Sequence, residues 1–387
     1  MEKIYFRRVN ILKIIKKKTG YKYIVIMLIF TLLIGLIVFI NNTYNSIEIS
    51  QGKYETTKVQ STNYSKNVEK LEEESKSLAD VIEKVTQSVV GISKLKNTGS
   101  SIFGSSDEGK LGLGTGIIVS SNGYILSNEH LTGEKFSKCY VTLEDGRNYD
   151  GTVVWSDTDL DLSIIQINAK GLQAVSFGDS SSIRVGESVY AIGNPIGFEF
   201  RRTVTSGIIS AKNRTIKLEE GDNLSYMTDL IQTDATINPG NSGGPLIYPN
   251  GEVIGINTVK ISSAEGIGFA VPINVIKNVI KNFDEQNKFD EATIGIYGYD
   301  KEVIPYLVSN NINFTKGIYV AKIISNGPAS STQLKEGDII VSVDGKEINT
   351  MNELKEYIYT KKPGEEILLN INRGKINKDI YITLRKK

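Results

Sequence analysis

The sequence predicts an antiparallel β domain, either a barrel or a sandwich, followed by a smaller unit of mixed strands and helix. Short apolar segments of strand length succeed one another between residues 116 and 271, and no helical period separates them. Two-residue turns join such segments at Asn122-Gly123, Asp145-Gly146 and Asn250-Gly251, and these turns favour the positive φ of antiparallel hairpins. With 387 residues, the chain is long enough for two or three domains.

Residues 23–40 form an apolar segment of 18 residues without a charge. This is about the minimum for a helix that crosses roughly 30 Å of hydrocarbon. A cleaved signal peptide is the alternative, but its apolar region is shorter, about 7–15 residues, and no small-residue cleavage site follows here. Residues 1–22 carry eight Lys or Arg side chains and one acid. By the positive-inside rule, we expect an uncleaved single-pass anchor with its N-terminus in the cytoplasm and the remaining chain outside the membrane.

Residues 41–77 are predicted to be a solvated linker, because they hold few large apolar side chains. A short amphipathic helix is expected next, since Leu78, Val81, Ile82, Val85 and Val89 recur at helical period. The predicted strands follow at 116–120, 124–127, 138–143, 149–155, 162–167, 187–193, 203–211, 228–233, 244–248, 252–260 and 267–271. A helix over 272–283, with Pro272 in its first turn, closes this block near residue 284.

After a polar connector at 285–293, the chain predicts a second, smaller α+β unit that extends to residue 387. Its strands are expected near 317–324, 338–343, 365–372 and 378–384, and its helix from Asn352 to Thr360. About 100 residues suffice for one small domain.

The charges and the rarest residues exclude several function classes. Outside residues 1–22 the chain holds 37 basic and 43 acidic side chains, and this mildly acidic body disfavours a nucleic-acid surface. A single cysteine, Cys139, and a single histidine, His130, provide neither an intrachain disulfide nor a Cys/His metal cluster. These counts do not exclude an Asp/Glu site for Mg²⁺ or Ca²⁺, but the sequence contains no EF-hand spacing. We expect no metal centre and no cofactor, and we expect Cys139 to be a small buried residue.

Residues 238–246, Asn-Pro-Gly-Asn-Ser-Gly-Gly-Pro-Leu, indicate a nucleophilic serine. The glycines around Ser242 let backbone N–H groups converge beside its hydroxyl, as an oxyanion hole requires. A Gly-Ser pair alone is typical of an ordinary turn, whereas the whole string favours a catalytic site. A serine is a weak nucleophile without a neighbouring base, and His130 is the only imidazole in the chain.

The third catalytic group should be a carboxylate that orients the imidazole, and the segment 156–165 offers three aspartates. Asp161 leads directly into an apolar strand, where it can be buried, and is therefore preferred. Asp157 and Asp159 are expected to cap or solvate the turn. The resulting order of His, Asp and Ser is that of chymotrypsin-type enzymes.

Further strings in the chain occur in the order of one protease family, at 88–92, 114–118, 123–128, 157–165, 193–195, 232–235, 240–246 and 266–272. On these strings, residues 78–284 resemble the protease domain of the HtrA (Deg) serine proteases. The resemblance implies two six-stranded β-barrels with the triad His130, Asp161 and Ser242 in the cleft between them. It also implies an oxyanion hole made by the N–H groups of Gly240 and Ser242.

The resemblance also bears on substrate choice. Trypsin-like enzymes that select Lys or Arg carry an aspartate six residues before the serine, and Thr236 stands there instead. A neutral pocket predicts small or medium aliphatic residues at P1, the position before the cleaved bond. By resemblance, Ile237, Ile267 and Phe269 would line this pocket.

Residues 285–387 resemble the PDZ domain that is attached to these proteases, on the strings 315–320, 334–340 and 343–346. Such a domain adds a peptide to a sheet edge and binds its C-terminal carboxylate with backbone N–H groups. The resemblance assigns this role to the residues Gly317, Ile318, Tyr319 and Val320, which we expect to form an edge strand.

The function expected from this organisation is an ATP-independent serine endopeptidase, anchored by one helix, that degrades unfolded or mislocalised proteins outside the cytoplasmic membrane. One alternative is a signalling protease that cuts a single dedicated substrate under PDZ control. Another is a chaperone or peptide-binding protein, for which a broken triad would be the sign. The family resemblance further suggests a homotrimer.

Overall fold

The computed structural model describes residues 31–40, 77–95, 111–193, 203–220, 223–258, 266–307, 312–374 and 376–387. The chain divides into two units, Met1–Glu74 and Ser75–Lys387. In the first unit, residues 31–40 are helical with exposed side chains, and residues 23–30 of the predicted anchor lie outside the described residues. No helix within the described ranges is both long enough and apolar enough to cross a membrane.

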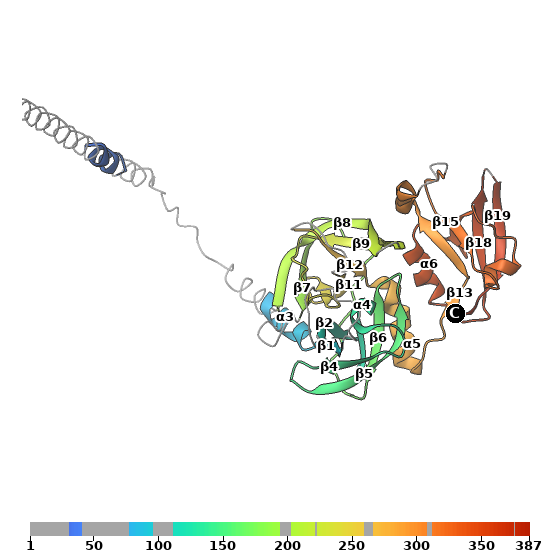
Figure 1. Cartoon of the computed structure of the whole chain (residues 1–387), viewed down its shortest axis with the longest axis horizontal. Coiled ribbons are helices and arrows are strands. Elements are labelled where there is room, and N and C mark those ends of the chain that lie inside the picture. The colour runs from blue at the N-terminus through green and yellow to red at the C-terminus, as the bar shows by residue number, and fades with distance from the viewer. Residues whose placement is uncertain are drawn as a thin grey trace, which may run out of the picture. The chain divides into compact units, whose positions relative to one another are not determined.

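The first half of the second unit contains a closed barrel of six antiparallel strands (Figure 1), which decides between the predicted barrel and sandwich. Its strands, in spatial order, are β1 (Val89–Leu95), β2 (Leu111–Ile118), β3 (Tyr124–Ser127), β6 (Leu162–Ile167), β5 (Asn148–Asp157) and β4 (Lys138–Thr142). The barrel is filled by β-branched and leucine side chains such as Val90, Ile125 and Ile165, all of which are fully buried. This alternation of inward apolar residues is the pattern that predicted strands rather than helices.

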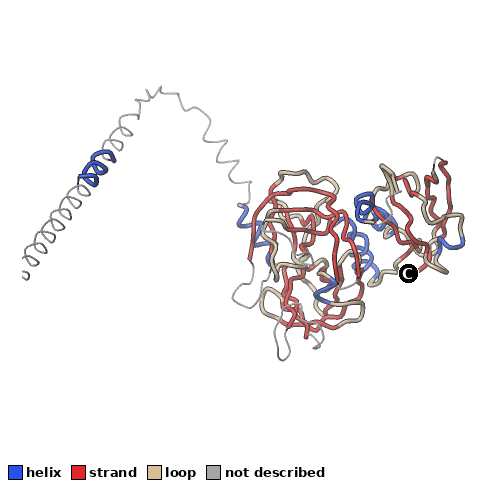
Figure 2. Tube along the Cα trace, turned by 45° about the horizontal axis from the view of Figure 1, so that its top comes forward, coloured by secondary structure: helices blue, strands red, loops and turns tan. Residues whose placement is uncertain are grey.

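A second closed barrel of six strands follows (Figure 2). Its spatial order is β10 (Pro245–Ile247), β11 (Val253–Thr258), β12 (Gly268–Pro272), β9 (Asn223–Thr233), β8 (Thr203–Glu220) and β7 (Ser188–Gly193). β8 and β9 are longer than the predicted 203–211 and 228–233. They pair with each other as far as Glu220 and Asn223. The extra pairs include charged residues such as Lys217 and Glu219, which concealed the strand pattern in the sequence.

Three helices accompany the barrels. α3 (Leu78–Thr86) opens the unit with a capping box between Ser77 and Asp80, and it ends before Val89 because that residue begins β1. α4 (Glu129–Thr132) follows β3 immediately. α5 (Asn274–Gln286) starts two residues later than predicted, since Pro272 is the last residue of β12.

The C-terminal part contains a sheet in the order β14 (Ile296–Asp300), β15 (Ile318–Ile323), β16 (Ile339–Val343), β18 (Glu366–Arg373) and β19 (Ile376–Thr383). The remaining elements are β13 (Ala292–Thr293), which pairs with β20 (Arg385–Lys386), β17 (Lys346–Glu347), η2 (Lys301–Tyr306), η3 (Pro328–Ser331) and α6 (Met351–Ile358). The side chains of Ile318, Ile340 and Leu369 lie in its separate core.

The sheet order corrects one prediction. The segment Gly317–Val320 is not an edge strand, because β15 is paired on one side with β14 and on the other with β16. The edge strand beside β15 is β14, and β19 forms the other edge of the sheet. Residues Ile296–Asp300 of β14 were not predicted as a strand. β14 has an irregular register at Tyr297/Gly298. Gly298 leaves room there for two side chains, because a Cβ would lie 2.6 Å from Cγ2 of Ile318 and 2.6 Å from Sδ of Met351 on α6.

Candidate active site

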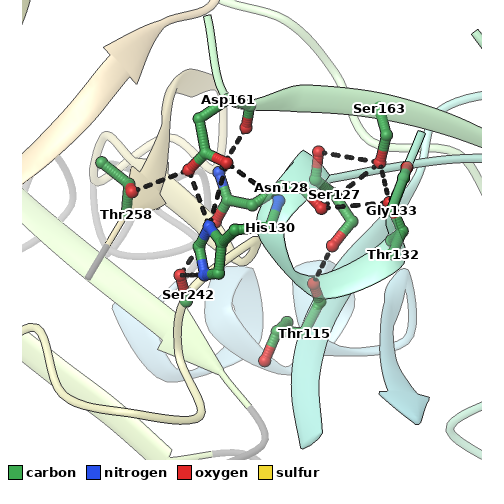
Figure 3. Close-up of polar contacts among 10 residues, drawn as sticks. All are labelled: Thr115, Ser127, Asn128, His130, Thr132, Gly133, Asp161, Ser163, Ser242 and Thr258. Carbon is green, nitrogen blue, oxygen red and sulfur yellow. Dashed lines mark hydrogen bonds and ion pairs between the residues drawn. The ribbon is translucent and has the colours of Figure 1, made fainter. Parts of the chain in front are cut away.

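His130, Asp161 and Ser242, which lie far apart in the sequence, meet where the two barrels join (Figure 3). His130 is on α4, Asp161 is on the turn between β5 and β6, and Ser242 is on the turn that precedes β10. The His130 Nδ1 atom lies 2.9 Å from Oδ1 and 2.8 Å from Oδ2 of Asp161. The Nε2 atom lies 3.3 Å from Oγ of Ser242. The structure thus brings together all three side chains that were predicted as a triad.

Asp161 is completely buried, and its carboxylate contacts the imidazole and accepts two further hydrogen bonds. Besides the imidazole, the backbone N–H of His130 donates to Oδ1 at 3.0 Å, and the hydroxyl of Thr258 donates to Oδ2 at 3.0 Å. Asp161 has a left-handed φ of 53°, which aspartate tolerates better than most residues. Thr258 lies at the end of β11, and it was not predicted from the sequence because a lone threonine carries no catalytic signal.

Asn128 is a second contact that was not predicted from the sequence. Its side chain is buried between the other members, where Oδ1 accepts a hydrogen bond from Ser242 Oγ at 2.9 Å. Its Nδ2 atom donates to the backbone carbonyl of Asp161, also at 2.9 Å. Asn128 therefore contacts two of the three predicted triad residues.

The turn before Ser242 depends on residues that allow a tight backbone. Pro239 and Gly240 occupy the centre of a turn that the Asn241 N–H closes by donating to the Asn238 carbonyl, and Gly240 has a φ of +111°. The Asn241 side chain fixes the turn further, because Nδ2 donates to the Thr236 carbonyl and Oδ1 accepts from the Asn238 N–H.

Gly243, the residue after Ser242, permits the close approach of the two barrels. It has a φ of +80°, and a Cβ would lie 2.1 Å from the Thr115 carbonyl of β2. The Thr115 N–H in turn donates to the Ser242 carbonyl at 2.9 Å. The glycine-rich string is therefore needed for packing as well as for the turn.

The three predicted pocket residues lie on the second barrel. Phe269 is buried in β12, whereas Ile267 is 36% exposed. Ile237 packs over Gly268, where a Cβ would lie 2.4 Å from Cγ1 of Ile237. Residues 194–202 and 259–265, the second of which ends two positions before Ile267, lie outside the described ranges.

Asp157, four residues before Asp161, is buried rather than solvated. It accepts the backbone N–H of Leu160 at 3.1 Å and so caps the turn, as predicted. Its carboxylate, however, also contacts Lys355 Nζ at 2.8 Å and the Tyr359 hydroxyl at 3.0 Å, and both residues belong to the C-terminal part of the chain. Burial opposes the ionisation of Asp157, but the charges of Lys355 and Lys387 outweigh it and lower its pKa.

A cavity of about 1450 Å³ lies beside this contact. One wall is formed by β14 and by α6, which contributes Met351, Leu354 and Ile358. The turn 156–159 of the first barrel also lines the cavity. The cavity is therefore bordered by the edge strand β14, and Tyr319 is the one residue of the predicted Gly317–Val320 segment among its lining residues.

Neither a metal centre nor a reactive cysteine is found among the described residues. No group of three His, Cys, Asp or Glu side chains among them could hold a metal ion. Cys139 is buried, and burial raises the pKa of its thiol to about 11, so it is a protonated core residue rather than a nucleophile.

Comparisons with known proteins agree with this geometry. Residues 114–256 match the trypsin-like peptidase domain, and residues 253–384 match the PDZ domain. The serine protease Do-like HtrB of Bacillus subtilis is 36% identical over 80% of this chain and 71% of its own length. The serine protease Do-like HtrA of Lactobacillus helveticus is 32% identical over 95% of this chain and 96% of its own.

Solved structures show the same likeness. The HtrA-type protease AlgW with a decapeptide has a TM-score of 0.57 and 30% identity, over 81% of this chain and 99% of its own. The serine endoprotease of Yersinia pestis has a TM-score of 0.52 and 29% identity, over 81% of this chain and 99% of its own. The trypsin-like and PDZ domains predicted from the sequence are thereby confirmed, and the chain is a serine endopeptidase that belongs to the HtrA family.

Proposed function

We propose that this endopeptidase cleaves peptide bonds by acyl transfer from Ser242. The observation that carries the proposal is the continuous series of contacts from Asp161 through His130 to Ser242. His130 Nε2 takes the proton of the serine hydroxyl as Oγ attacks the substrate carbonyl, and it later gives this proton to the leaving amine. Asp161 holds the imidazole in the tautomer whose Nδ1 carries hydrogen, which leaves Nε2 as the acceptor.

The oxyanion that forms during attack would be stabilised by the backbone N–H groups of Gly240 and Ser242. Support for this role comes from the positive φ of Gly240 at the third position of its turn, since that conformation sets the direction of the preceding peptide group. Ile237, Ile267 and Phe269 remain the proposed lining of a pocket for small or medium aliphatic P1 side chains.

The proposed substrates are unfolded or mislocalised proteins outside the cytoplasmic membrane, cleaved without ATP in protein quality control. The periplasmic serine endoprotease DegQ of Escherichia coli, 35% identical to this chain, supports an extracytoplasmic site of action. Residues 23–40 would be the single-pass anchor, with the cationic residues 1–22 in the cytoplasm. We also propose that the protein assembles as a homotrimer.

Substrate C-termini would bind in the cavity between β14 and α6 instead of at Gly317–Val320. An unpaired strand edge accepts an extended peptide as an additional strand, and β14 has such an edge whereas β15 is paired on both sides. Peptide binding by a protein of similar fold supports this proposal, because the HtrA-type protease AlgW has been solved with a decapeptide.

The direct test is cleavage of unfolded casein by the full-length chain in detergent, compared with Ser242→Ala. Loss of roughly 10⁶-fold in kcat is expected, because triad members act as a unit. Ser330→Ala, which changes an exposed serine of the C-terminal part, serves as the matched control and should cleave at the parental rate. Casein cleavage that survives purification of Ser242→Ala would refute the assignment of the nucleophile.

A further inference from the structure

Asn128 occupies the N-cap position of α4 but does not cap it. An asparagine at this position ordinarily accepts a hydrogen bond from a backbone N–H of the first helical turn. Here the side chain makes no such bond. The first N–H groups of the helix donate to Asp161 instead. The Glu129 N–H donates to the Asp161 carbonyl at 3.2 Å, and the His130 N–H donates to the Asp161 carboxylate. The Asn128 side chain is thus available for another contact.

The orientation of the Asn128 amide follows from its partners. The carbonyl oxygen of Asp161 can only accept a hydrogen bond, so the atom that faces it at 2.9 Å must be the donor Nδ2. The amide oxygen Oδ1 therefore faces Ser242. Because Oδ1 can only accept, the serine hydroxyl must be the donor in the 2.9 Å contact between them.

The single hydroxyl proton of Ser242 cannot serve two acceptors fully at once. The neutral imidazole donates from Nδ1 to Asp161, which leaves Nε2 as an acceptor at 3.3 Å from the serine oxygen. The asparagine oxygen is the nearer acceptor by 0.4 Å. Asn128 is fully buried and Ser242 is 1% exposed, so water cannot replace the bond that either one loses.

We propose that Asn128 is a positioning residue that holds the proton of Ser242 away from His130 in the resting enzyme. The proposal rests on the proposed roles of Ser242 and His130. Rotation about the Cβ–Oγ bond moves the proton from the asparagine oxygen to Nε2 without breaking a covalent bond. Proton transfer to Nε2 then proceeds as in the proposed acyl transfer, and the asparagine is chemically unchanged throughout.

The unique histidine makes this arrangement measurable. Selective ¹⁵N labelling of histidine in the full-length chain gives signals from one imidazole only, because His130 has no counterpart. A hydrogen bond accepted by Nε2 moves its ¹⁵N signal upfield. With the imidazole neutral, we expect Asn128→Ala to move the Nε2 signal upfield, since Ser242 loses its nearer acceptor and turns to His130.

Two matched variants separate this effect from a general disturbance of the site. In Ser242→Ala the further change Asn128→Ala should leave the Nε2 signal unmoved, because no hydroxyl remains. Thr258→Val removes a hydrogen bond from Asp161 without touching Ser242, and it should change the Nδ1–H signal more than the Nε2 signal. If Asn128→Ala does not fold, Asn128→Ser replaces it, since a serine hydroxyl is too short to take the place of the amide oxygen.

An Nε2 signal that is the same in the parent and in Asn128→Ala would overturn the proposal. So would an upfield movement of equal size in the Ser242→Ala background. Neither result depends on proteolysis, so a failure here remains distinct from a failure of the proposed function, which would appear as casein cleavage by Ser242→Ala.

Discussion

Asp157 and Asp161 lie four residues apart at the turn between β5 and β6, and both are buried, but different groups surround them. Asp161 is fully buried, and its carboxylate contacts the imidazole, a threonine hydroxyl and a backbone N–H. Asp157 is 3% exposed and faces the ammonium groups of Lys355 and Lys387. The Asp161 carboxylate is thus held by residues of the protease part of the chain. The Asp157 carboxylate is held by residues of the C-terminal part, about two hundred positions further along the chain.

The difference teaches what each carboxylate contributes. A lysine beside Asp161 would neutralise the charge that the imidazolium needs during the reaction, whereas neutral donors orient the carboxylate and leave its charge available. At Asp157 the ion pair instead joins α6 to the first barrel. We therefore expect changes at Asp161 to alter rate and changes at Asp157 to alter stability.

The largest effect should come from Asp161→Asn. The amide Nδ2 would donate to Nδ1 of His130, force the imidazole hydrogen onto Nε2 and so remove the acceptor for the Ser242 proton. A fall of about 10⁴-fold in kcat on casein or a peptide substrate is expected, with the free energy of unfolding nearly unchanged. A variant that retains more than about a tenth of the parental kcat would contradict the role of Asp161.

Lys355→Met tests the other carboxylate. It leaves the buried Asp157 without its nearest cation, and the free energy of unfolding in urea should fall by about 3 kcal/mol, the lower end for a broken buried pair because Lys387 remains at 3.8 Å. Lys346→Met is the control, since its ammonium lies 4.0 Å from Glu356 and its side chain is half exposed. Equal destabilisation by the two variants would show that the buried Lys355–Asp157 pair contributes no more to the free energy of unfolding than the exposed Lys346–Glu356 pair.

The opposite end of α6 extends the comparison to a third buried aspartate. Asp229 of β9 accepts a hydrogen bond from the Thr350 hydroxyl at the α6 N-cap, but its charged neighbours are acidic. Burial, with the charges of Asp300 and Glu353, raises the pKa of Asp229 to about 7. Burial also raises the pKa of Asp300, in β14, to about 6. At one end of the helix the buried carboxylate of Asp157 is therefore paired with cations, whereas at the other end the carboxyl groups of Asp229 and Asp300 have raised pKa values.

Asp229→Asn should remove part of a pH dependence. Because the folded-state pKa lies above the ordinary 3.8, the folded protein retains a proton that the unfolded chain releases. The stability from this site is present below about pH 4 and is lost as pH rises through 7. The variant cannot ionise at this position. Between pH 5 and pH 7, its free energy of unfolding in urea should therefore fall by about 2 kcal/mol less than that of the parent. Asp379→Asn, at an exposed carboxyl, should follow the parental curve; parallel curves for parent and Asp229→Asn would count against the assigned pKa.

The smallest effect is expected for Tyr359→Phe. It removes only the hydroxyl that donates to Asp157 at 3.0 Å and keeps the ring that packs edge-on against Trp155. A loss of about 1.5 kcal/mol in the free energy of unfolding is expected, as for a hydrogen bond to a charged group. A loss as large as that of Lys355→Met would mean that the hydroxyl, and not the ion pair, joins the two parts.

The sequence patterns were sufficient for most strands and for the triad because both have local or unique signals, whereas two closed barrels were expected only from the family resemblance. Apolar alternation and Asn-Gly turns marked most strands, and the glycine-rich string with a single histidine left few choices for nucleophile and base. Thr258 and Asn128 have no such signal, because the residues they contact, Asp161 and Ser242, lie 97 and 114 positions away in the sequence. The same holds for Asp157, whose partner Lys355 lies 198 residues further along the chain.

The sheet edge of the C-terminal part was predicted wrongly for a different reason. Gly317–Val320 has the apolar pattern of a strand, and β15 does form there, but strand position within a sheet is set by pairing and not by pattern. β14 escaped notice because Gly298 interrupts its short apolar run, and the side chains of Ile318 and Met351 that approach this glycine are distant in the sequence.

The central claim is that Ser242 is the nucleophile and that His130 activates it, and covalent labelling tests this most directly. The full-length chain, treated with a phosphonofluoridate at neutral pH and mapped by mass spectrometry, should carry one label, on Ser242. His130→Ala should abolish labelling at that position, because no other imidazole can take the proton. A label on another serine, or labelling of Ser242 at the parental rate in His130→Ala, would contradict the account.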